Sequence, residues 1–328
     1  ASIFLLIKQP TDYYIYYGII VGSAIASSLW NNIILFREIP FSFRKVNWKR
    51  HLRYVWVTYL ISLFYTVPLV LDNVILRLVS TASAVGLYAF SVKIVRTGAN
   101  LLTDSFLVFF PRIVSLAKEK DDVQLRQKLF LNIQFIILLS VPMGAGLYLV
   151  ADELTIVFFG SKFLAVADNL RLLAIFPFLK GVSLFLSNPV LIAHNREKNF
   201  LKNLAGGTII FIGAAIWLGS VYNDTGICAA LVLTELFMVI TNYVSAKKQL
   251  PSLSLSLIDW KTLAQALLGS ALFIPIVYLI RNNIDTNFVR LLTSIIACFA
   301  VYGLFLLIVR NSFILQLKNI AARFVFKK

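Results

Sequence analysis

The chain has 328 residues, of which 59% are hydrophobic and 14% charged, and its mean hydropathy is +0.83. A soluble domain is about half apolar and about a quarter charged, so this composition excludes an ordinary soluble enzyme. A formal net charge of +16 would suggest nucleic acid as the partner of a soluble protein. In a membrane protein, basic loops that orient the helices account for it, and we expect no nucleic-acid partner.

In chain order, the first segment is ASIFLLIKQP, in which Ile3 to Ile7 resemble the end of a helix. We interpret residues 1–8 as the remnant of a truncated transmembrane helix. Nine apolar stretches follow, each of about the 20 residues needed to cross about 30 Å of hydrocarbon. They are expected at 13–35, 54–76, 85–109, 128–150, 167–192, 201–221, 226–246, 262–280 and 288–309. The predicted fold class is an all-α polytopic membrane protein.

Irregular features are expected within and between these spans. Prolines are tolerated in membrane helices where neighbours satisfy the freed backbone groups, and five lie inside the expected spans: Pro68, Pro142, Pro177, Pro189 and Pro275. The segment DELTIVFFGSKF, residues 152–163, is too short to cross a bilayer. We expect it to lie at the outer interface.

The basic residues predict the orientation of the helices. One set of alternate loops, together with the C-terminal tail, holds 22 of the 31 Lys and Arg residues, and the opposite set holds six. Cytoplasmic loops carry the excess of Lys and Arg, so the first set and the C-terminus are predicted to be cytoplasmic. The three remaining cations are Lys93, Arg96 and Lys180, and all fall inside expected spans.

Common enzymatic motifs are not found. The sequence contains no phosphate-binding P-loop. His51 and His194 lie in or beside basic loops without metal-ligand spacing, and Cys228 and Cys298 lie in apolar helices. We expect no enzyme, no metal site and no cofactor, with coupling to H⁺ or Na⁺ left open.

The stretch GLYAFSVKIVRTGANLLTDSF, residues 86–106, combines an apolar background with a polar stripe. At about 100° per residue, Lys93, Arg96, Thr97, Asn100 and Asp104 fall within an arc of about 100°. A charge at the bilayer centre costs at least about 2.5–3.5 kcal/mol unless it meets water or a partner. The stripe is therefore expected to face protein or a water-filled cavity.

Two interpretations of this stripe stay open. In the first, Arg96 pairs with Asp104 or with Asp72 of the preceding helix, and the cluster only fixes packing. In the second, Lys93 and Arg96 line a cavity that receives an anionic group. The second is favoured because cations exceed acids on the stripe and Lys180 adds another.

Further buried charges have their own alternatives. Lys180 lies mid-span in FPFLKGVSLFLSNPVL, and Glu235 in LVLTELFMVI is its obvious acidic partner. Glu235 is also a candidate for proton coupling, because burial favours the protonated form of a carboxylate. For Asp72 and Arg77, a local ion pair within LDNVILRL is expected.

Several motifs together resemble a known family. LDNVILRLVSTASAVGLYAFSVKI, FFPRIVSLAKEKD, IVFFGSKFLAVADNLRLLAIFPFL, PVLIAHNREKNFLKN and TGICAALVLTELF occur in this order. They resemble the second lobe of polysaccharide flippases, the Wzx-type transporters of the multidrug/oligosaccharidyl-lipid/polysaccharide superfamily. The resemblance covers residues 50–250 well and is diffuse elsewhere.

The resemblance implies two six-helix lobes around a central cavity, with two further C-terminal helices. Residues 9–50 would then hold the last helix of the first lobe and a basic linker. Residues 51–246 would form the six-helix C-lobe, and 247–328 the additional helices and a basic tail.

The resemblance also implies a function: flipping an undecaprenyl-diphosphate-linked oligosaccharide, such as an O-antigen unit, between leaflets of the bacterial inner membrane by alternating access. Its partners would be this substrate, membrane lipids and, as an association to test, polysaccharide polymerase machinery. Candidate cavity residues are Lys93, Arg96, Asn100 and Lys180, and candidate pairing or coupling acids are Asp72, Asp104 and Glu235. The alternatives are a cation-coupled multidrug exporter of the same superfamily and a membrane glycosyltransferase or polymerase.

Overall fold

The computed structural model describes residues 13–38, 48–107, 110–119, 121–249, 259–311 and 313. Within these ranges the secondary structure is helical. The helices are α2 (Tyr13–Glu38), α3 (Trp48–Val79), α4 (Ala82–Leu107), α5 (Phe110–Glu119), α6 (Asp122–Leu149), α7 (Ala151–Phe159), η1 (Ser161–Phe163), α8 (Ala165–Leu172), η2 (Leu173–Ile175), α9 (Phe176–Phe185), η3 (Leu186–Ile192), α10 (Glu197–Gln249), α11 (Trp260–Ala271), α12 (Phe273–Asn283) and α13 (Asn287–Ile308).

The chain divides into two compact units, residues 1–54 and 55–328. The described part of the first unit is α2 and the first turns of α3, and residues 1–8, the expected helix remnant, lie outside the described residues. The second unit holds the rest of α3 and all later helices. The finer division expected at residues 246 and 247 stays a prediction.

Seven helical stretches of the described chain are long and apolar enough to cross a membrane. One of them, Glu197–Lys248, contains two of the nine expected spans. The two spans are the two halves of α10, which meet at a bend at Asn223, where φ is 55°. A positive φ is uncommon for a residue other than Gly, and the Asn223 side-chain oxygen accepts a hydrogen bond from the Ser80 hydroxyl at 2.7 Å across this bend. The remaining expected span corresponds to α4, whose hydropathy is lowered by Lys93 and Arg96.

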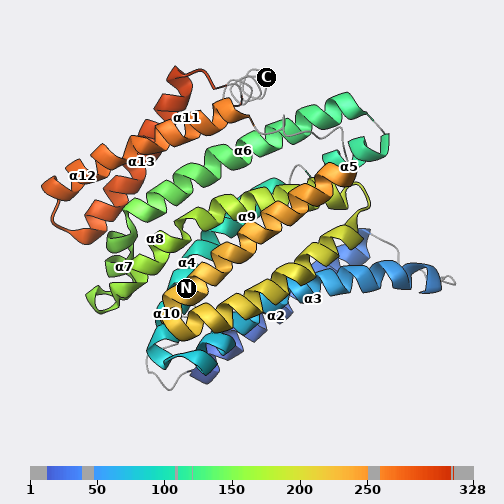
Figure 1. Ribbon diagram of the computed structural model, residues 1–328, viewed down its shortest axis with the longest axis horizontal. Helices are drawn as coiled ribbons and strands as arrows, with labels where there is room; N and C mark the ends of the chain where they lie inside the picture. Colours follow the sequence, from blue (N-terminus) through green and yellow to red (C-terminus); the bar gives the residue numbers. More distant parts are fainter. Residues whose placement is uncertain are drawn as a thin grey trace. The chain divides into compact units, whose positions relative to one another are not determined.

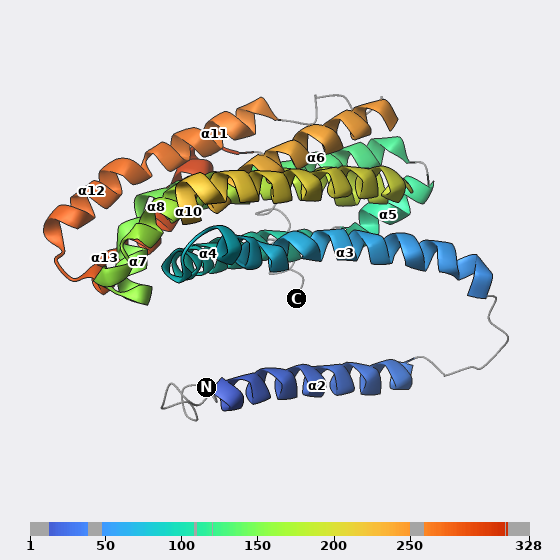
Figure 2. The ribbon, with the colours of Figure 1, turned by 60° about the horizontal axis from the view of Figure 1, so that its bottom comes forward.

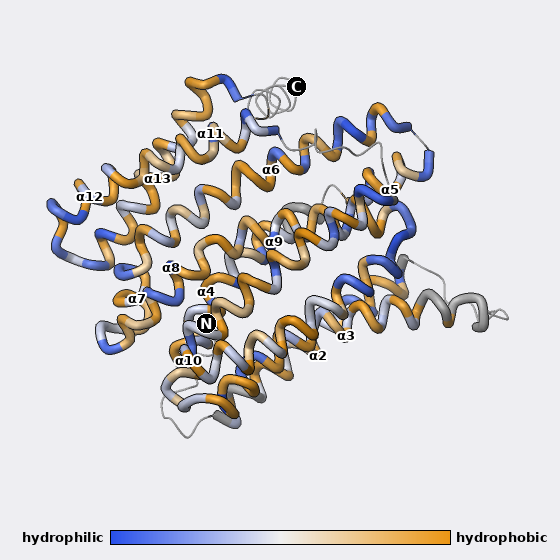
Figure 3. The backbone as a smooth tube through the Cα atoms, in the orientation of Figure 1, coloured by the Kyte–Doolittle hydropathy of each residue, from blue (hydrophilic) through white to orange (hydrophobic). Residues whose placement is uncertain are grey.

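The helices of the second unit form an elongated bundle (Figure 1). The α3–α4 turn, the bend of α10, α7 and the α12–α13 turn gather at one end, and α5, the start of α6 and both ends of α10 lie at the other. α11 and α12 continue each other as one bent rod (Figure 2). Hydrophobic residues predominate along the helices, and hydrophilic residues gather at the turns between them (Figure 3), as bilayer-spanning helices require.

The interior of the second unit holds two hydrophobic clusters. One joins α5, α6, α9, η3, α11–α13 and the two end portions of α10, and the other joins α3, α4, α8 and the portions of α10 on either side of its bend. The outward face is also apolar, with large side chains such as Trp217, Leu268 and Phe299 exposed. A soluble surface seldom presents such continuous apolar area, whereas lipid is its natural solvent.

Two prolines free backbone carbonyls that side-chain hydroxyl groups from distant helices then satisfy. A proline removes the hydrogen bond to the carbonyl four residues earlier. Pro68 frees the carbonyl of Phe64, and the Thr208 hydroxyl donates to that oxygen at 3.2 Å while sharing its proton with the Leu204 carbonyl at 3.0 Å. Pro142 in α6 similarly frees the Leu138 carbonyl, to which Tyr302 of α13 donates at 2.9 Å. The expectation that neighbours satisfy the freed groups is confirmed at these two sites.

The span Ala165–Ile192 is broken into α8, η2, α9 and η3 rather than being one regular helix. Pro177 lies in the first turn of α9, where its missing N–H costs least. Pro189 lies within η3, a π-helical segment. Such π-helical turns occur frequently at functional sites, and Ser187 of this segment lines the cavity described below.

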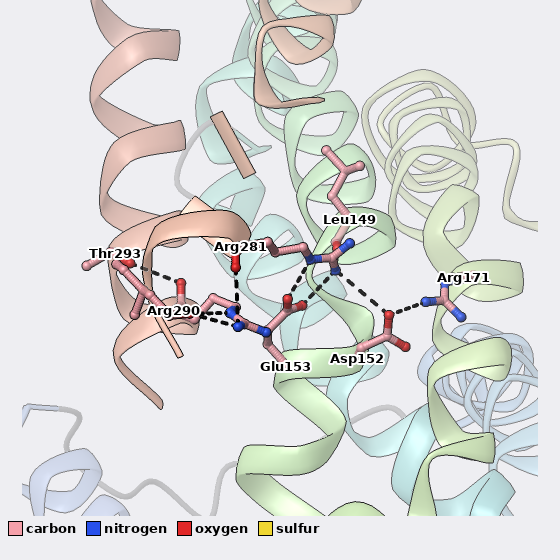
Figure 4. A network of polar contacts seen from close by, with 8 residues as sticks. Leu149, Asp152, Glu153, Arg171, Arg281, Arg290 and Thr293 are labelled. Atoms are coloured by element: carbon pink, nitrogen blue, oxygen red, sulfur yellow. Dashed lines mark hydrogen bonds and ion pairs between the residues drawn. The ribbon is translucent and has the colours of Figure 1, made fainter. Parts of the chain in front are cut away.

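A charged network attaches the α12–α13 pair to α6 and α7 (Figure 4). Arg281 donates from Nε and Nη2 to the two carboxylate oxygens of Glu153 at 2.6 and 2.9 Å, and from Nη2 to the Leu149 carbonyl at 2.7 Å. Arg290 donates to the Ile284 carbonyl, which closes the α12–α13 turn. Burial would raise the pKa of Glu153, but the hydrogen bonds and charge of Arg281 outweigh it and hold that pKa below its usual value.

The short segment predicted at 152–163 is confirmed as too short to span. It folds as α7 of 9 residues followed by the single turn η1. Asp152 in the first turn of α7 forms an ion pair with Arg171 of α8, and Glu153 beside it forms one with Arg281 of α12. These two ion pairs attach the segment to the rest of the bundle.

Side-chain caps define the starts of two helices. Asp121 accepts the backbone N–H of Gln124 at 3.0 Å and begins α6. Asp259 begins α11 by accepting the N–H of Lys261 at 3.0 Å. Burial opposes the ionised form of Asp259, but hydrogen bonds from Thr262, Gln134 and the backbone lower its pKa overall.

Candidate substrate cavity

A cavity of about 190 Å³ lies between α3, α4, α9 with η3, and both halves of α10. Its charged lining residues are Arg96, Lys180 and Glu235. Hydroxyl and amide groups come from Asn100, Thr103, Ser183, Ser187, Thr208 and Thr234, and the aromatic side chains are Phe64, Tyr65, Phe176 and Phe200. Pro68 of α3 and Ser187 of the π-helical segment η3 both contribute to its wall.

Arg96 on α4 reaches the wall of the cavity while bonded to a buried acid of α3. Its Nη2 donates to Asp72 Oδ2 at 2.8 Å; the exposed fraction is 24% for the Arg96 side chain and 0% for Asp72. Asp72 accepts three further hydrogen bonds, from the Tyr88 hydroxyl at 2.9 Å and from the backbone and side-chain nitrogens of Asn73 at 2.6 and 2.9 Å. Both oxygens of the buried Asp72 carboxylate thus accept hydrogen bonds within the protein.

Lys180 on α9 forms the second ion pair. Its Nζ donates to Glu235 Oε1 of α10 at 2.7 Å and lies 4.9 Å from the centroid of the Tyr65 ring, a cation–π contact. Glu235 Oε2 is buried and has no hydrogen-bond partner among the described residues. The two ion pairs therefore differ, since Asp72 has four donors and Glu235 has one.

The structure brings Arg96, Asn100, Lys180 and Glu235 to one cavity, but Lys93 does not line it. Lys93 is exposed, and its expected place beside Arg96 in the cavity needs correction. The two positions are about 60° apart around the helix, and only Arg96 is turned toward Asp72.

The position of Asp72 decides two further predictions, the acidic partner of Arg96 and the local pair of Asp72 with Arg77. Of the acids proposed for Arg96, Asp72 is the partner, and the side chain of Asp104 lies outside what the structure describes. The expected local pair of Asp72 with Arg77 is wrong. Five positions along a helix lie about 140° apart, so Arg77 is exposed on another face while Asp72 is buried.

The charge of the cavity also differs from expectation. The sequence suggested an excess of cations, but Arg96 and Lys180 each have an acidic partner. The two cations and two acids of these pairs balance. The cavity is therefore a polar site in which each cation is held by an acid.

Sequence reasoning missed several lining residues, notably Tyr65 and Thr208. Tyr65 lies in a long apolar run where a tyrosine carries no distinguishing signal. Pro68 did indicate that the Phe64 carbonyl needs a donor, but it could not identify Thr208, which lies 144 positions later.

Comparison with known proteins gives a family match over part of the chain and a match to a solved fold. Residues 13–168 match the model of a family described as polysaccharide biosynthesis protein. The fold is similar to that of the lipid II flippase MurJ in an inward closed conformation, with a TM-score of 0.67 and 15% sequence identity. The match covers 84% of this chain and 58% of MurJ, so the chain spans little more than half the length of that protein. No curated protein matches the sequence.

Proposed function

Because this chain is related to polysaccharide biosynthesis proteins and has the fold of a lipid II flippase, we propose that it is part of a transporter for a lipid-linked oligosaccharide. The transporter moves an undecaprenyl-diphosphate-linked repeat unit, such as an O-antigen unit, from the inner to the outer leaflet. It is a transporter and not an enzyme.

One observation carries this proposal: a polar cavity inside an apolar bundle that presents an Arg and a Lys together. A diphosphate is recognised by cations, and the planar guanidinium of Arg suits bidentate contacts with phosphate oxygens. Arg96 and Lys180 supply these cations from two different helices. Asn100, Ser183 and Thr234 add the donors and acceptors that sugar hydroxyls need.

The transport cycle we propose is alternating access, in which this lobe rocks against another around the fixed site. Pro68 of α3 lines the cavity, and Pro189 lies in the same π-helical segment η3 as the lining residue Ser187, which supports these two prolines as places where the helices flex. The excess of basic residues in one set of loops supports a cytoplasmic C-terminus in the inner membrane. Association with a polysaccharide polymerase is part of the proposal.

A second candidate within the same superfamily is a cation-coupled drug exporter. The structure favours this candidate more than the sequence does, because both cations of the cavity are paired with acids. A cavity that also contains Tyr65 and Phe64 could accept an aromatic cation. The match of residues 13–168 to a polysaccharide biosynthesis family favours a glycan-linked substrate over a drug.

The test uses the full-length gene in its own bacterium, with Arg96→Ala and Lys180→Ala as cavity variants. Both are expected to abolish surface glycan while folded protein is still present in the membrane. Lys93→Ala is the matched control, since it removes an exposed cation from the same helix as Arg96. Normal surface glycan in both cavity variants would refute the proposal. Increased drug sensitivity with normal glycan would support the drug exporter instead.

A further inference from the structure

Glu235 is a buried acid whose charge depends on a single donor. Its Oε1 accepts from Lys180 at 2.7 Å, its Oε2 has no hydrogen-bond partner among the described residues, and the residue is 8% exposed. A buried carboxylate without donors is costly, and it escapes the cost by taking up a proton. The ionised form of Glu235 is thus stabilised mainly by Lys180.

The comparison with Asp72 makes this dependence specific. If Arg96 turned away from Asp72, the carboxylate would keep the hydrogen bonds from Tyr88 and from both nitrogens of Asn73. Hydrogen bonds to the ionised form favour it, and Asp72 would keep three of them. If Lys180 turned away from Glu235, no described hydrogen-bond donor would remain.

Lys180 is also one of the two cations that line the cavity in which we place the diphosphate. A phosphate oxygen at Lys180 would put two anions on one ammonium group, and like charges in one site disfavour each other's ionisation. A diphosphate esterified at both ends does not take up protons near neutral pH. The group that can be neutralised is therefore Glu235.

The other charged or titratable groups of the cavity do not replace Lys180 as the partner of Glu235. Tyr65 on α3 faces Lys180 with its ring, and Arg96 on α4 is bonded to Asp72. Within α10 itself, the neighbouring Thr234 hydroxyl donates to the Ala230 carbonyl. None of these groups donates to Glu235 in the described structure.

We propose that binding of a diphosphate ester at Lys180 is coupled to the uptake of one proton by Glu235. The contact between Lys180 Nζ and Glu235 Oε1 breaks, Lys180 donates to a phosphate oxygen, and Glu235 takes up one proton that the buffered solution supplies. No bond between heavy atoms changes, and release of the ester reverses each step. The inference rests on the proposed function and adds a proton-binding residue to it.

The experiment measures binding of a short-chain prenyl-diphosphate-linked monosaccharide to the purified full-length protein in detergent. Calorimetry in two buffers of different ionisation enthalpy gives the protons taken up per molecule bound, and repetition across pH gives the affinity. With one proton taken up, affinity rises by up to about tenfold for each unit of pH decrease. Glu235→Gln is expected to bind without proton uptake and without this pH dependence.

Glu153→Gln is the matched control, because Glu153 is another buried acid in an ion pair, outside the cavity. It is expected to keep the proton uptake of the unmodified protein. Binding by the unmodified protein without proton uptake would overturn the coupling and leave the proposed function standing, and this measurement needs no variant. Proton uptake that persists in Glu235→Gln would also overturn the coupling. If the unmodified protein does not bind the probe at any pH, the proposed function fails, and the coupling fails with it.

Discussion

The Arg96–Asp72 pair offers a direct way to separate a packing role from a substrate role, because its two members are embedded differently. Asp72 is fully buried and accepts four hydrogen bonds, whereas Arg96 makes one bond to it and is 24% exposed at the cavity. Removing Asp72 leaves the buried Tyr88 hydroxyl and the Arg96 charge without their acceptor. Removing Arg96 leaves Asp72 with three donors.

These differences set the expected sizes of the two effects. Asp72→Ala should lower the free energy of unfolding by about 3–5 kcal/mol, the range for breaking a buried ion pair from one side. Arg96→Ala should cost about 1.5–3 kcal/mol, the range for one hydrogen bond to a charged group. We therefore expect Asp72→Ala to reduce the amount of folded protein. Arg96→Ala should abolish surface glycan with the folded protein still present.

The assay is unfolding of the full-length protein in detergent, with membrane abundance and surface glycan measured in the same strains. Arg96→Lys is the conservative variant, which keeps the charge but loses the planar guanidinium. The reasoning is refuted if Arg96→Ala destabilises the protein as much as Asp72→Ala does. In that case the pair acts in packing, and the glycan phenotype of Arg96→Ala follows from loss of folded protein.

Two further predictions concern the α12–α13 pair. Arg281 lowers the pKa of Glu153 from 4.5 in the folded protein. Glu153 therefore contributes stability above its unfolded pKa, and this contribution is lost as the pH falls through the lower folded pKa. The free energy of unfolding measured across acid pH should show this loss, and Glu153→Gln should make that free energy less dependent on pH. Tyr302→Phe leaves the Leu138 carbonyl without its donor and should lower the free energy of unfolding by about 0.6–1.7 kcal/mol, the range between membrane helices. The exposed Tyr278→Phe is its control, and an equal effect of both changes would contradict the explanation.

The spans could be predicted because they follow from local properties of the chain. A run of about 20 apolar residues has one stable solution in lipid, a helix whose backbone groups are satisfied internally. The structure accordingly has helices at the expected places, including the short α7 and the bend between the two halves of α10 at Asn223. The polar stripe of α4 was also visible, since 3.6-residue periodicity is a property of the sequence.

The pairing of charges could not be predicted in the same way, because it depends on which residues face each other across different helices. Arg96 had two candidate acids, and its partner Asp72 lies 24 positions away. Lys93 and Arg96 share a stripe in the sequence, yet only Arg96 lines the cavity. The net charge of the site, inferred from the sequence as basic, is balanced for this reason.

The sequence by itself determined that this protein is a bundle of membrane helices, where the helices lie and which of them carry charge, since hydropathy and helical periodicity are local. Only the tertiary structure decided that Asp72 accepts four hydrogen bonds and Glu235 one, because the donors Tyr88 and Arg96 reach Asp72, and Lys180 reaches Glu235, from other helices. That difference distinguishes a structural acid from one whose charge can change, and it arises from the packing of α3, α4, α9 and α10 around one cavity.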